Sequence, residues 1–343
     1  MRVLFSAYPH VGISQGGMYL QIQHTAAALK RQGVEVVFHD SWRNPFEQEV
    51  DLCHCFSTHQ AGFGVFRAAL DRGVPCVWSN VLNIFDKSRV RLRLETRLSA
   101  IIPGFLPTWK EAASLAARST KLIALNELEA EVLGSLFPVA KGKILTIPNG
   151  FDRNMAGADP NLFRQTFGIS TLGYVVNVAK VGPVKNQLKL IEAAKGQDWT
   201  LAIVGVIDDS DYSRACRAAS FGHPNILLTG ALPYSSPLLA SAYAGSSVFC
   251  LPSHSEVQPL TLIEAAQNNC NLVVSRNFPV QSFLQPHVIR INPDDPAAIR
   301  AGINLALSRP PTGTLDAISA QPSWDLVATR VRGIYDEIQG SRR

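Results

Sequence analysis

The chain has 343 residues, of which 46% are hydrophobic and 17% charged, and its net charge is +5. This composition predicts a globular protein long enough to bury two hydrophobic cores. It excludes a disordered chain, and the sequence has neither the roughly 18 apolar residues of a membrane span nor the basic, aromatic-rich stripe typical of nucleic-acid binding.

Cysteine usage indicates a reducing compartment. No Cys-x-x-Cys pair occurs, and most of the cysteines lie in apolar runs, so we expect reduced core residues of a cytoplasmic protein and no zinc site. They are Cys53, Cys55, Cys76, Cys216, Cys250 and Cys270. Residues 1–9 have too short an apolar core for a signal peptide and are predicted to contain the first strand.

The first part of the chain alternates between strand and helix patterns. An apolar strand over 3–7 is followed by a glycine-containing turn, a helix over 18–32 and a strand over 34–39, which is typical of a Rossmann-like domain. No Gly-x-Gly-x-x-Gly occurs, so a dinucleotide cofactor is not expected. Gly16 and Gly17 instead let a ligand approach the backbone at the start of a helix.

Further strands are predicted over 52–56, 75–79, 121–125 and 144–147, with a helix over 63–72. Ligands bind beyond the carboxyl ends of parallel strands, so polar residues near these ends are candidates for a pocket, although lone histidines are more often structural. The candidates are His10, His54, His59, Asn80 and Asn83.

A basic segment covers residues 87–97, and apolar residues follow it as far as Trp109. One interpretation is a solvated helix face. The alternative is a surface that contacts the acceptor or an anionic membrane, because cationic side chains beside apolar ones suit a lipid interface.

Pro148-Asn149-Gly150-Phe151-Asp152 interrupts the alternation, and a polar stretch continues to about Ser170. Proline, glycine and asparagine are typical of turns, so this stretch is predicted to be a linker. We expect a first domain over 1–165, a second over 166–322 and a terminal helical segment over 323–343.

The second domain is predicted to begin with a strand over 174–178. A loop with Lys180 and Lys185 comes next, and these lysines would add positive charge to a phosphate site. The helices expected after it cover 188–195, a segment ending near Leu307, and 324–338; the strands expected cover 201–205, 226–230, 271–275 and 288–291.

Residues 247–266 predict a strand, a polar loop and a helix. The loop carries Glu256, Pro259 is expected at the first helical position, and Glu264 lies within the helix. The amides of Thr261 and Leu262 would then be free to bind an anion. The two glutamates could hold the ends of an extended ligand with an anionic centre, and a nucleotide-sugar has that form.

Three of these motifs carry a family resemblance. Glu256-x7-Glu264, Lys185-Asn186 and the 148–152 junction resemble the retaining glycosyltransferases of family four (GT4), and the resemblance extends over nearly the whole chain. It implies an α/β protein of GT-B fold, in which two Rossmann-like domains with parallel sheets face each other across a cleft. It also implies that the terminal helix packs back on the first domain.

The resemblance assigns roles to particular residues. Lys180 and Lys185, with the amides of Pro259, Leu260, Thr261 and Leu262, would stabilise the departing diphosphate. Glu256 would bind the donor sugar and Glu264 the ribose hydroxyls. Gly16 and Gly17 would lie against the diphosphate and the acceptor, and the strand ends at Gly205 and Leu232 would receive the nucleobase.

The implied activity is transfer of a hexosyl group from an NDP-sugar to a glycan or lipid-linked acceptor hydroxyl, in bacterial cell-surface polysaccharide or glycolipid assembly. The protein would be cytoplasmic, with peripheral contact at an anionic membrane. No metal or cofactor is expected, because helix amides and lysines can replace a divalent ion.

The sequence departs from the family pattern at two places. Ala179-Lys180 replaces Gly-Arg, which keeps the charge but loses the bidentate guanidinium, and Asn80 stands near where many relatives carry a sugar-contacting histidine. Two alternatives therefore stay open: a sugar-nucleotide epimerase or hydrolase, and a non-catalytic nucleotide-sugar-binding protein.

Overall fold

The computed structural model describes residues 1–14, 16–56, 60–82, 89–101, 107–152, 157–171, 173–311, 313–318 and 320–341. The chain divides into two compact units. Unit 1 comprises Met1–Gly150 and Pro322–Arg343, and unit 2 comprises Phe151–Gln321. The sequence had suggested boundaries at residues 165 and 322.

Unit 1 is built on a six-stranded sheet in which neighbouring strands run parallel, in the order β2-β1-β3-β4-β5-β6. Apolar runs supply the strands, and all residues of the inner strands β3 and β4 are buried. The strands are β1 (Arg2–Ser6), β2 (Glu35–Phe38), β3 (Leu52–Phe56), β4 (Cys76–Ser79), β5 (Lys121–Ala124) and β6 (Ile144–Thr146).

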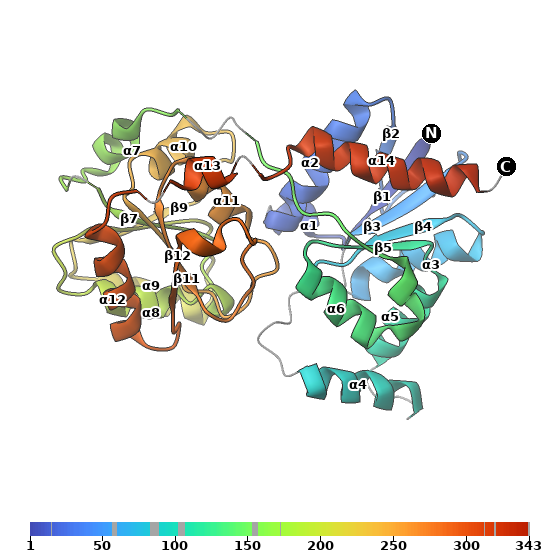
Figure 1. Cartoon of the computed structure of the whole chain (residues 1–343), viewed down its shortest axis with the longest axis horizontal. Helices are drawn as coiled ribbons and strands as arrows, with labels where there is room; N and C mark the ends of the chain where they lie inside the picture. Colours follow the sequence, from blue (N-terminus) through green and yellow to red (C-terminus); the bar gives the residue numbers. More distant parts are fainter. Residues whose placement is uncertain are drawn as a thin grey trace. The chain divides into compact units, whose positions relative to one another are not determined.

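Helices pack against this sheet, with the last helix of the chain lying beside α2 (Figure 1). Arg31 of α2 forms an ion pair with Asp325 of α14, and Gln339 donates a hydrogen bond to the carbonyl of Asp51. The end of the chain is thus part of unit 1. The helical segments of unit 1 are α1 (Val11–Ser14), α2 (Gly17–Arg31), η1 (Gln60–Gly62), α3 (Phe63–Asp71), α4 (Arg89–Ile101), α5 (Pro107–Arg118), α6 (Glu127–Leu136), η2 (Pro138–Lys143) and α14 (Trp324–Gly340).

Packing within unit 1 explains why the 148–152 junction contains a glycine. A Cβ atom on Gly150 would lie 2.6–2.7 Å from atoms of Trp324, which is too close for any residue except glycine. The Trp324 ring stacks on His24 of α2, with ring centroids 5.1 Å apart. The place where the chain leaves unit 1 is therefore packed against the start of α14.

Unit 2 has a second six-stranded sheet with parallel neighbours, in the order β12-β11-β10-β7-β8-β9. Successive residues of a strand enter different cores: Val176 and Phe249 belong to one cluster, and Val175 and Cys250 to another. The strands are β7 (Val175–Val178), β8 (Leu201–Val204), β9 (Ile226–Gly230), β10 (Val248–Leu251), β11 (Asn271–Ser275) and β12 (Val288–Ile291).

The two cores mean that unit 2 is covered by helices on both faces of its sheet, the arrangement expected for a parallel sheet. The expected α/β fold with two parallel sheets is thereby confirmed. The helical segments of unit 2 are α7 (Pro160–Phe167), η4 (Pro183–Lys185), α8 (Gln187–Ala194), α9 (Asp211–Ser220), α10 (Pro237–Ala244), α11 (Leu260–Gln267), η5 (Gln285–His287), α12 (Pro296–Leu307) and α13 (Thr314–Ile318).

The prediction of a linker continuing to Ser170 was wrong for its second half, where α7 forms. Asp159 caps this helix by accepting a hydrogen bond from the Asn161 amide, and Gly168 ends it in a left-handed conformation. Phe163 is fully buried and stacks on Tyr174, with ring centroids 5.6 Å apart. Phe167, one turn later, packs on Phe163 with ring centroids 4.7 Å apart, so two aromatic residues anchor this helix to the core.

Candidate functional site

The site in unit 2 is organised around the loop between β10 and α11. Glu256 in this loop is 6% exposed, and its Oε1 atom lies 2.5 Å from Nζ of Lys185, which is carried by η4. The structure thus brings together two of the three residues expected to be catalytic. A charge-assisted hydrogen bond at this burial fixes both side chains in one geometry.

Asn186 explains why these two loops lie together. Its backbone is left-handed (φ 59°), a conformation that asparagine tolerates better than most residues. Its side-chain amide donates hydrogen bonds to the carbonyls of Pro252 and Pro293, and the His254 amide donates to the carbonyl of Val184. The Lys185-Asn186 pair therefore joins the exits of three strands at the carboxyl edge of the sheet.

The start of α11 differs by one residue from the prediction. The helix begins at Leu260, and Pro259 is the N-cap residue, with extended backbone angles. The Leu262 amide is not free as expected, since it donates a hydrogen bond to the Pro259 carbonyl, and proline itself has no N–H. Of the four residues assigned to hold the diphosphate, Leu260 and Thr261 supply the amides that open the helix.

Glu264 lies on the same helix and is buried, with 6% of its surface exposed. Burial raises the pKa of its carboxyl to about 7, and a hydrogen bond from the Tyr243 hydroxyl, at 2.6 Å from Oε2, acts in the opposite direction. The Glu264 carboxyl can therefore change charge near neutral pH.

Lys180 is placed differently from Lys185. Its ammonium lies 3.2 Å from Asp208, and more than half of its side chain is exposed. Asp208 also accepts hydrogen bonds from Ser210 and Ser213, and these, with Lys180, hold the pKa of the Asp208 carboxyl well below its usual range. The expected phosphate contact of Lys180 would have to compete with this pair.

Gly205 and Leu232 lie in the loops that follow β8 and β9. A Cβ atom on Gly205 would lie 2.0 Å from the carbonyl oxygen of Ala179, so only glycine lets these two strand exits approach each other. Leu232 is partly buried and packs on the core of unit 2. Their expected nucleobase contact stays a prediction.

In unit 1, Gly16 is the N-cap of α2, and Gly17 is its first residue. Among the described residues, no atom lies within 4 Å of a Cβ atom built on either glycine. Their expected contact with a ligand stays a prediction.

The prediction of His54 as a pocket residue was wrong. This histidine is buried within β3, with Nδ1 2.5 Å from the Tyr335 hydroxyl and Nε2 2.8 Å from the Ser79 hydroxyl. Burial lowers the pKa of its imidazole to about 3, so it stays neutral and joins α14 to the sheet.

The other pocket candidates of unit 1 differ in their exposure to solvent. His10 is exposed, and its ring packs on Tyr8. Asn80 is buried at the end of β4, and its Oδ1 atom has no hydrogen-bond partner among the described residues. His59 and Asn83 lie outside the described residues, as do residues 87–88 and 102–106 of the basic and apolar segment.

Sequence reasoning missed Tyr243 and Asp208. Tyr243 lies in an apolar helix, and nothing in its neighbours indicates that its hydroxyl reaches Glu264. Asp208 follows β8 closely, and its position beyond a strand end was a usable signal.

An Asp-x-Asp spacing also occurs at Asp209 and Asp211. The Arg214 guanidinium pairs with both carboxylates, at 2.9 and 2.6 Å. Among the described residues, no group of three or more His, Cys, Asp or Glu side chains is arranged to hold a metal ion. In the same part of the chain, every helix is too short or too polar to cross a membrane.

Part of the chain matches a known protein family. Residues 161–319 match the family model described as glycosyl transferases group 1. The matched segment lies within unit 2 and contains Lys185, Glu256 and Glu264. No curated protein matches the chain in sequence.

Solved structures resemble the chain over almost its full length. Sucrose-phosphate synthase from Thermosynechococcus elongatus superposes with a TM-score of 0.78 at 14% identity, covering 99% of each chain. Anabaena Alr3699/HepE in complex with UDP and glucose gives 0.73 at 17% identity, covering 98% of this chain and 100% of the other. The catalytic domain of starch synthase IV from Arabidopsis thaliana, bound to ADP and acarbose, gives 0.68 at 14%, covering 99% of each. The fold is therefore GT-B.

Proposed function

We propose that this protein is a retaining glycosyltransferase of family four, which transfers a hexosyl group from an NDP-sugar to an acceptor hydroxyl. The observation that carries the proposal is the pair of half-buried Lys185 with buried Glu256 beside the start of α11, within the segment that matches a glycosyltransferase family model. It has the charge pattern of a pyrophosphate site flanked by acids.

In this proposal the chemistry is electrostatic. Negative charge grows on the departing diphosphate, and preorganised donors at that position stabilise it more than they stabilise the bound substrate. Lys185 supplies an ammonium, and Leu260 and Thr261 supply amides at the positive end of a helix. Lys180 would also contact the diphosphate once its ion pair with Asp208 is broken.

The acids and glycines recognise the rest of the ligands. Glu256 accepts hydrogen bonds from the donor sugar, and Glu264 accepts them from the ribose. Gly205 and Leu232 leave room for the base, and Gly16 and Gly17 serve the diphosphate and the acceptor. No metal ion takes part, so activity is expected to persist in EDTA; strict dependence on Mn²⁺ would contradict this step.

The test is a thermal-shift panel of UDP, GDP and ADP and their sugars, followed by a transfer assay. UDP and ADP come first, because they are bound in the structures of HepE and starch synthase IV. A ligand at one hundred times its Kd stabilises a protein by about 2.7 kcal/mol, which is readily measured. Retention is checked by NMR of the anomeric proton in the first-formed product.

Other results would lead to other functions. Release of free sugar or of an epimer without an acceptor would indicate a hydrolase or epimerase. Binding without turnover with any acceptor would indicate a nucleotide-sugar-binding protein. If no nucleoside diphosphate binds, the proposal fails.

We also propose that the protein acts in the cytoplasm on glycan or lipid-linked acceptors of polysaccharide or glycolipid assembly, with α4 contacting an anionic membrane. The sequence of α4 contains Arg89, Arg91, Arg93 and Arg97 against one acidic residue, Glu95, with which Arg91 pairs. Vesicle flotation tests the contact: replacing Arg89, Arg91 and Arg93 by serine should remove binding to anionic vesicles. Equal binding of wild type to neutral vesicles would contradict it.

A further inference from the structure

Two buried amide side chains lie next to the site of unit 2, and the proposed reaction does not use them. Asn177 interrupts the apolar run of β7, Gln187 is the first residue of α8, and neither exposes any of its surface. Nδ2 of Asn177 donates a hydrogen bond to the Cys250 carbonyl at 2.7 Å, and its Oδ1 accepts one from Nε2 of Gln187 at 3.4 Å. Because Cys250 belongs to β10, these bonds join α8 to two neighbouring strands of the sheet.

Gln187 also reaches back to the loop that carries both lysines of the site, residues 180–185, which we call the lysine loop. Its Oε1 accepts a hydrogen bond from the Gly182 amide at 3.2 Å, and its Nε2 donates one to the Lys180 carbonyl at 3.1 Å. Both polar atoms of this side chain are thus bonded, as burial requires. The side chain therefore holds two residues of the lysine loop against β7.

Gly182 connects Gln187 to Lys185. While its amide is bound by Gln187, its carbonyl accepts hydrogen bonds from the amides of Lys185 and Asn186, at 2.9 and 3.2 Å. The backbone on both sides of Gly182 is therefore fixed, and from it the Lys185 side chain extends to Oε1 of Glu256. A continuous series of hydrogen bonds thus runs from the sheet, through Gln187 and Gly182, to the ion pair of the site.

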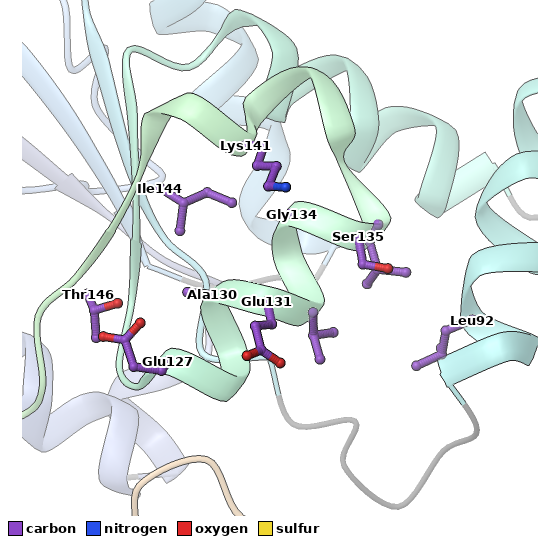
Figure 2. Close-up of a pocket in the computed structure, with 11 residues that line it drawn as sticks. Leu92, Glu127, Ala130, Glu131, Gly134, Ser135, Lys141, Ile144 and Thr146 are labelled. Atoms are coloured by element: carbon purple, nitrogen blue, oxygen red, sulfur yellow. The ribbon is translucent and has the colours of Figure 1, made fainter.

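An exposed polar residue gives a contrast. Lys141 lines a cavity of about 530 Å³ between α6, η2 and β6 of unit 1, and its side chain is exposed to solvent (Figure 2). Replacing such a residue changes stability little. At the position of Gln187, an apolar residue of the same shape could fill the space at little cost, so stability alone does not call for an amide. A fixed lysine does, because donors that stabilise a transition state must be held in place beforehand.

We propose that Gln187 is a positioning residue, which holds the Lys185 ammonium in place through Gly182. Its effect on the Lys185–Glu256 pair is a property of the fold of unit 2. Its effect on transfer rests on the proposed function, in which the ammonium has to lie within about 0.5 Å of its productive position at the departing diphosphate.

The first test is a double-mutant cycle in urea unfolding of the full chain, with Gln187→Met and Lys185→Ala. Methionine has nearly the length of glutamine and favours a helix, but it lacks the amide. Lys185→Ala should destabilise the wild type, because it leaves the Glu256 carboxylate unpaired, and should destabilise Gln187→Met less, because the pair is already loosened. We expect the two losses to differ by about threefold or more in the equilibrium constant for unfolding. Additive losses would show that the proposal is wrong.

The matched control is Asn271→Leu. Asn271 is also a buried amide, 4% exposed, and its Nδ2 donates to the carbonyls of Ala306 and Arg309, but it begins β11 at the opposite edge of the sheet. This variant should lose stability, and its loss should add to that of Lys185→Ala. Coupling between these two positions as strong as that between Gln187 and Lys185 would overturn the proposal.

The second test is kinetic. Gln187→Met should lower kcat by about tenfold or more, as for a small misplacement of a reacting group, and leave KM within about threefold, because the diphosphate gains charge only as its bond breaks. In the Lys185→Ala background, the same substitution should have almost no further effect. An equal factor in both backgrounds would indicate a structural role alone and contradict the proposal.

The two tests separate this inference from the proposed function. The unfolding cycle needs no nucleotide, so coupling in a protein that binds no nucleoside diphosphate would keep the role of Gln187 and remove the transferase. Transfer by a protein whose cycles are additive would do the reverse. If Gln187→Met does not fold, Gln187→Asn takes its place in both cycles, since it keeps an amide that is one methylene shorter and is expected to lose the bond to Gly182.

Discussion

At the scale of single residues, the proposed role of Glu264 predicts that nucleotide binding is sensitive to pH. Its pKa is about 7, and the ionised form is the better acceptor for ribose hydroxyls. Below pH 7 binding must displace a proton, so affinity for the nucleoside diphosphate should fall by up to about tenfold per pH unit. Calorimetry between about pH 6 and 8 measures this slope.

The variant Tyr243→Phe tests whether Glu264 is the group that titrates. The tyrosine hydroxyl lowers the pKa of Glu264, so its removal should move the midpoint of the affinity profile to higher pH. Glu264→Gln is the control, and its profile should lose the contribution of this carboxyl. A midpoint that stays in place or moves to lower pH in Tyr243→Phe would exclude Glu264 as the titrating group.

Lys185 is expected to matter far more than a neighbouring lysine. Lys185→Ala should lower kcat/KM by about a hundredfold or more, as when one preorganised donor is lost. Lys189, which pairs with Glu192 on α8, is the control, and Lys189→Ala should change kcat/KM by less than about twofold. Steady-state kinetics that show equal losses would remove the special role of Lys185.

Lys185→Ala also leaves the Glu256 carboxylate buried without its ammonium, at a cost of about 1–3 kcal/mol in the free energy of unfolding. The double variant Lys185→Ala/Glu256→Ala should regain part of this stability without regaining transfer. Denaturant unfolding separates the two effects.

The residues of the site could be predicted where a local pattern carries them. Lys185 and Glu256 follow predicted strands in loops of unit 2, and parallel strands bring such loops to one edge. Tyr243 could not be found this way, because its hydrogen bond to Glu264 depends on how α10 packs on α11. His54 was misassigned because a histidine near a strand end has the same local pattern whether it faces a pocket or the core.

At the scale of elements, Glu129 fixes the segment after β4. Its two carboxylate oxygens accept hydrogen bonds from the amides of Leu82 and Leu125, at 2.5 and 2.6 Å, and the side chain is fully buried. Val81, between Asn80 and Leu82, has a positive φ of 48°, which is unusual for a β-branched residue. The carboxylate holds the backbone in this strained turn.

Glu129→Ala should therefore lower the free energy of unfolding by about 2–5 kcal/mol, because two buried amides lose their acceptor. Glu129→Gln keeps one acceptor oxygen and should lose less. Glu127→Gln, at an exposed position of the same helix, serves as the stability control and should change the value by less than about 0.5 kcal/mol in urea unfolding. Equal stability of Glu129→Ala and wild type would show that water replaces the carboxylate.

Glu129 also shows the limit of a local motif. Asn126 and Glu129 have the spacing of a capping box, and the asparagine side chain does accept a hydrogen bond from the Glu129 amide. The returning acid, however, binds the amide of Leu125, just before the helix, and that of Leu82, which is far away in sequence. Strands such as β3, β9 and β11 were predicted to the residue because their apolar runs are bounded by turn formers. The helix α7 was missed because it is only eight residues long, and its apolar pair Phe163 and Phe167 lies within a polar stretch.

At the scale of the molecule, unit 2 is one continuous segment. Its two cores lie on the faces of its own sheet, and Lys185, Glu256 and Glu264 are all within it. Residues 151–321 expressed alone should fold with a radius of gyration of about 15 Å and bind the nucleoside diphosphate within about tenfold of the full chain.

Small-angle scattering and calorimetry check this prediction. The isolated segment should not transfer sugar, because the proposed acceptor contacts belong to unit 1. A segment that aggregates, or that ignores a nucleotide which the full chain binds, would show that unit 1 takes part in forming the site.

Unit 1, by contrast, is completed by the last helix of the chain. Tyr335 of α14 closes over His54, and Trp324 closes over Gly150. During synthesis on the ribosome, the first 150 residues emerge well before these partners, and unit 2 is made in between. Unit 1, which is translated first, is therefore completed last, and a premature stop codon before Trp324 would leave its core open while unit 2 folds.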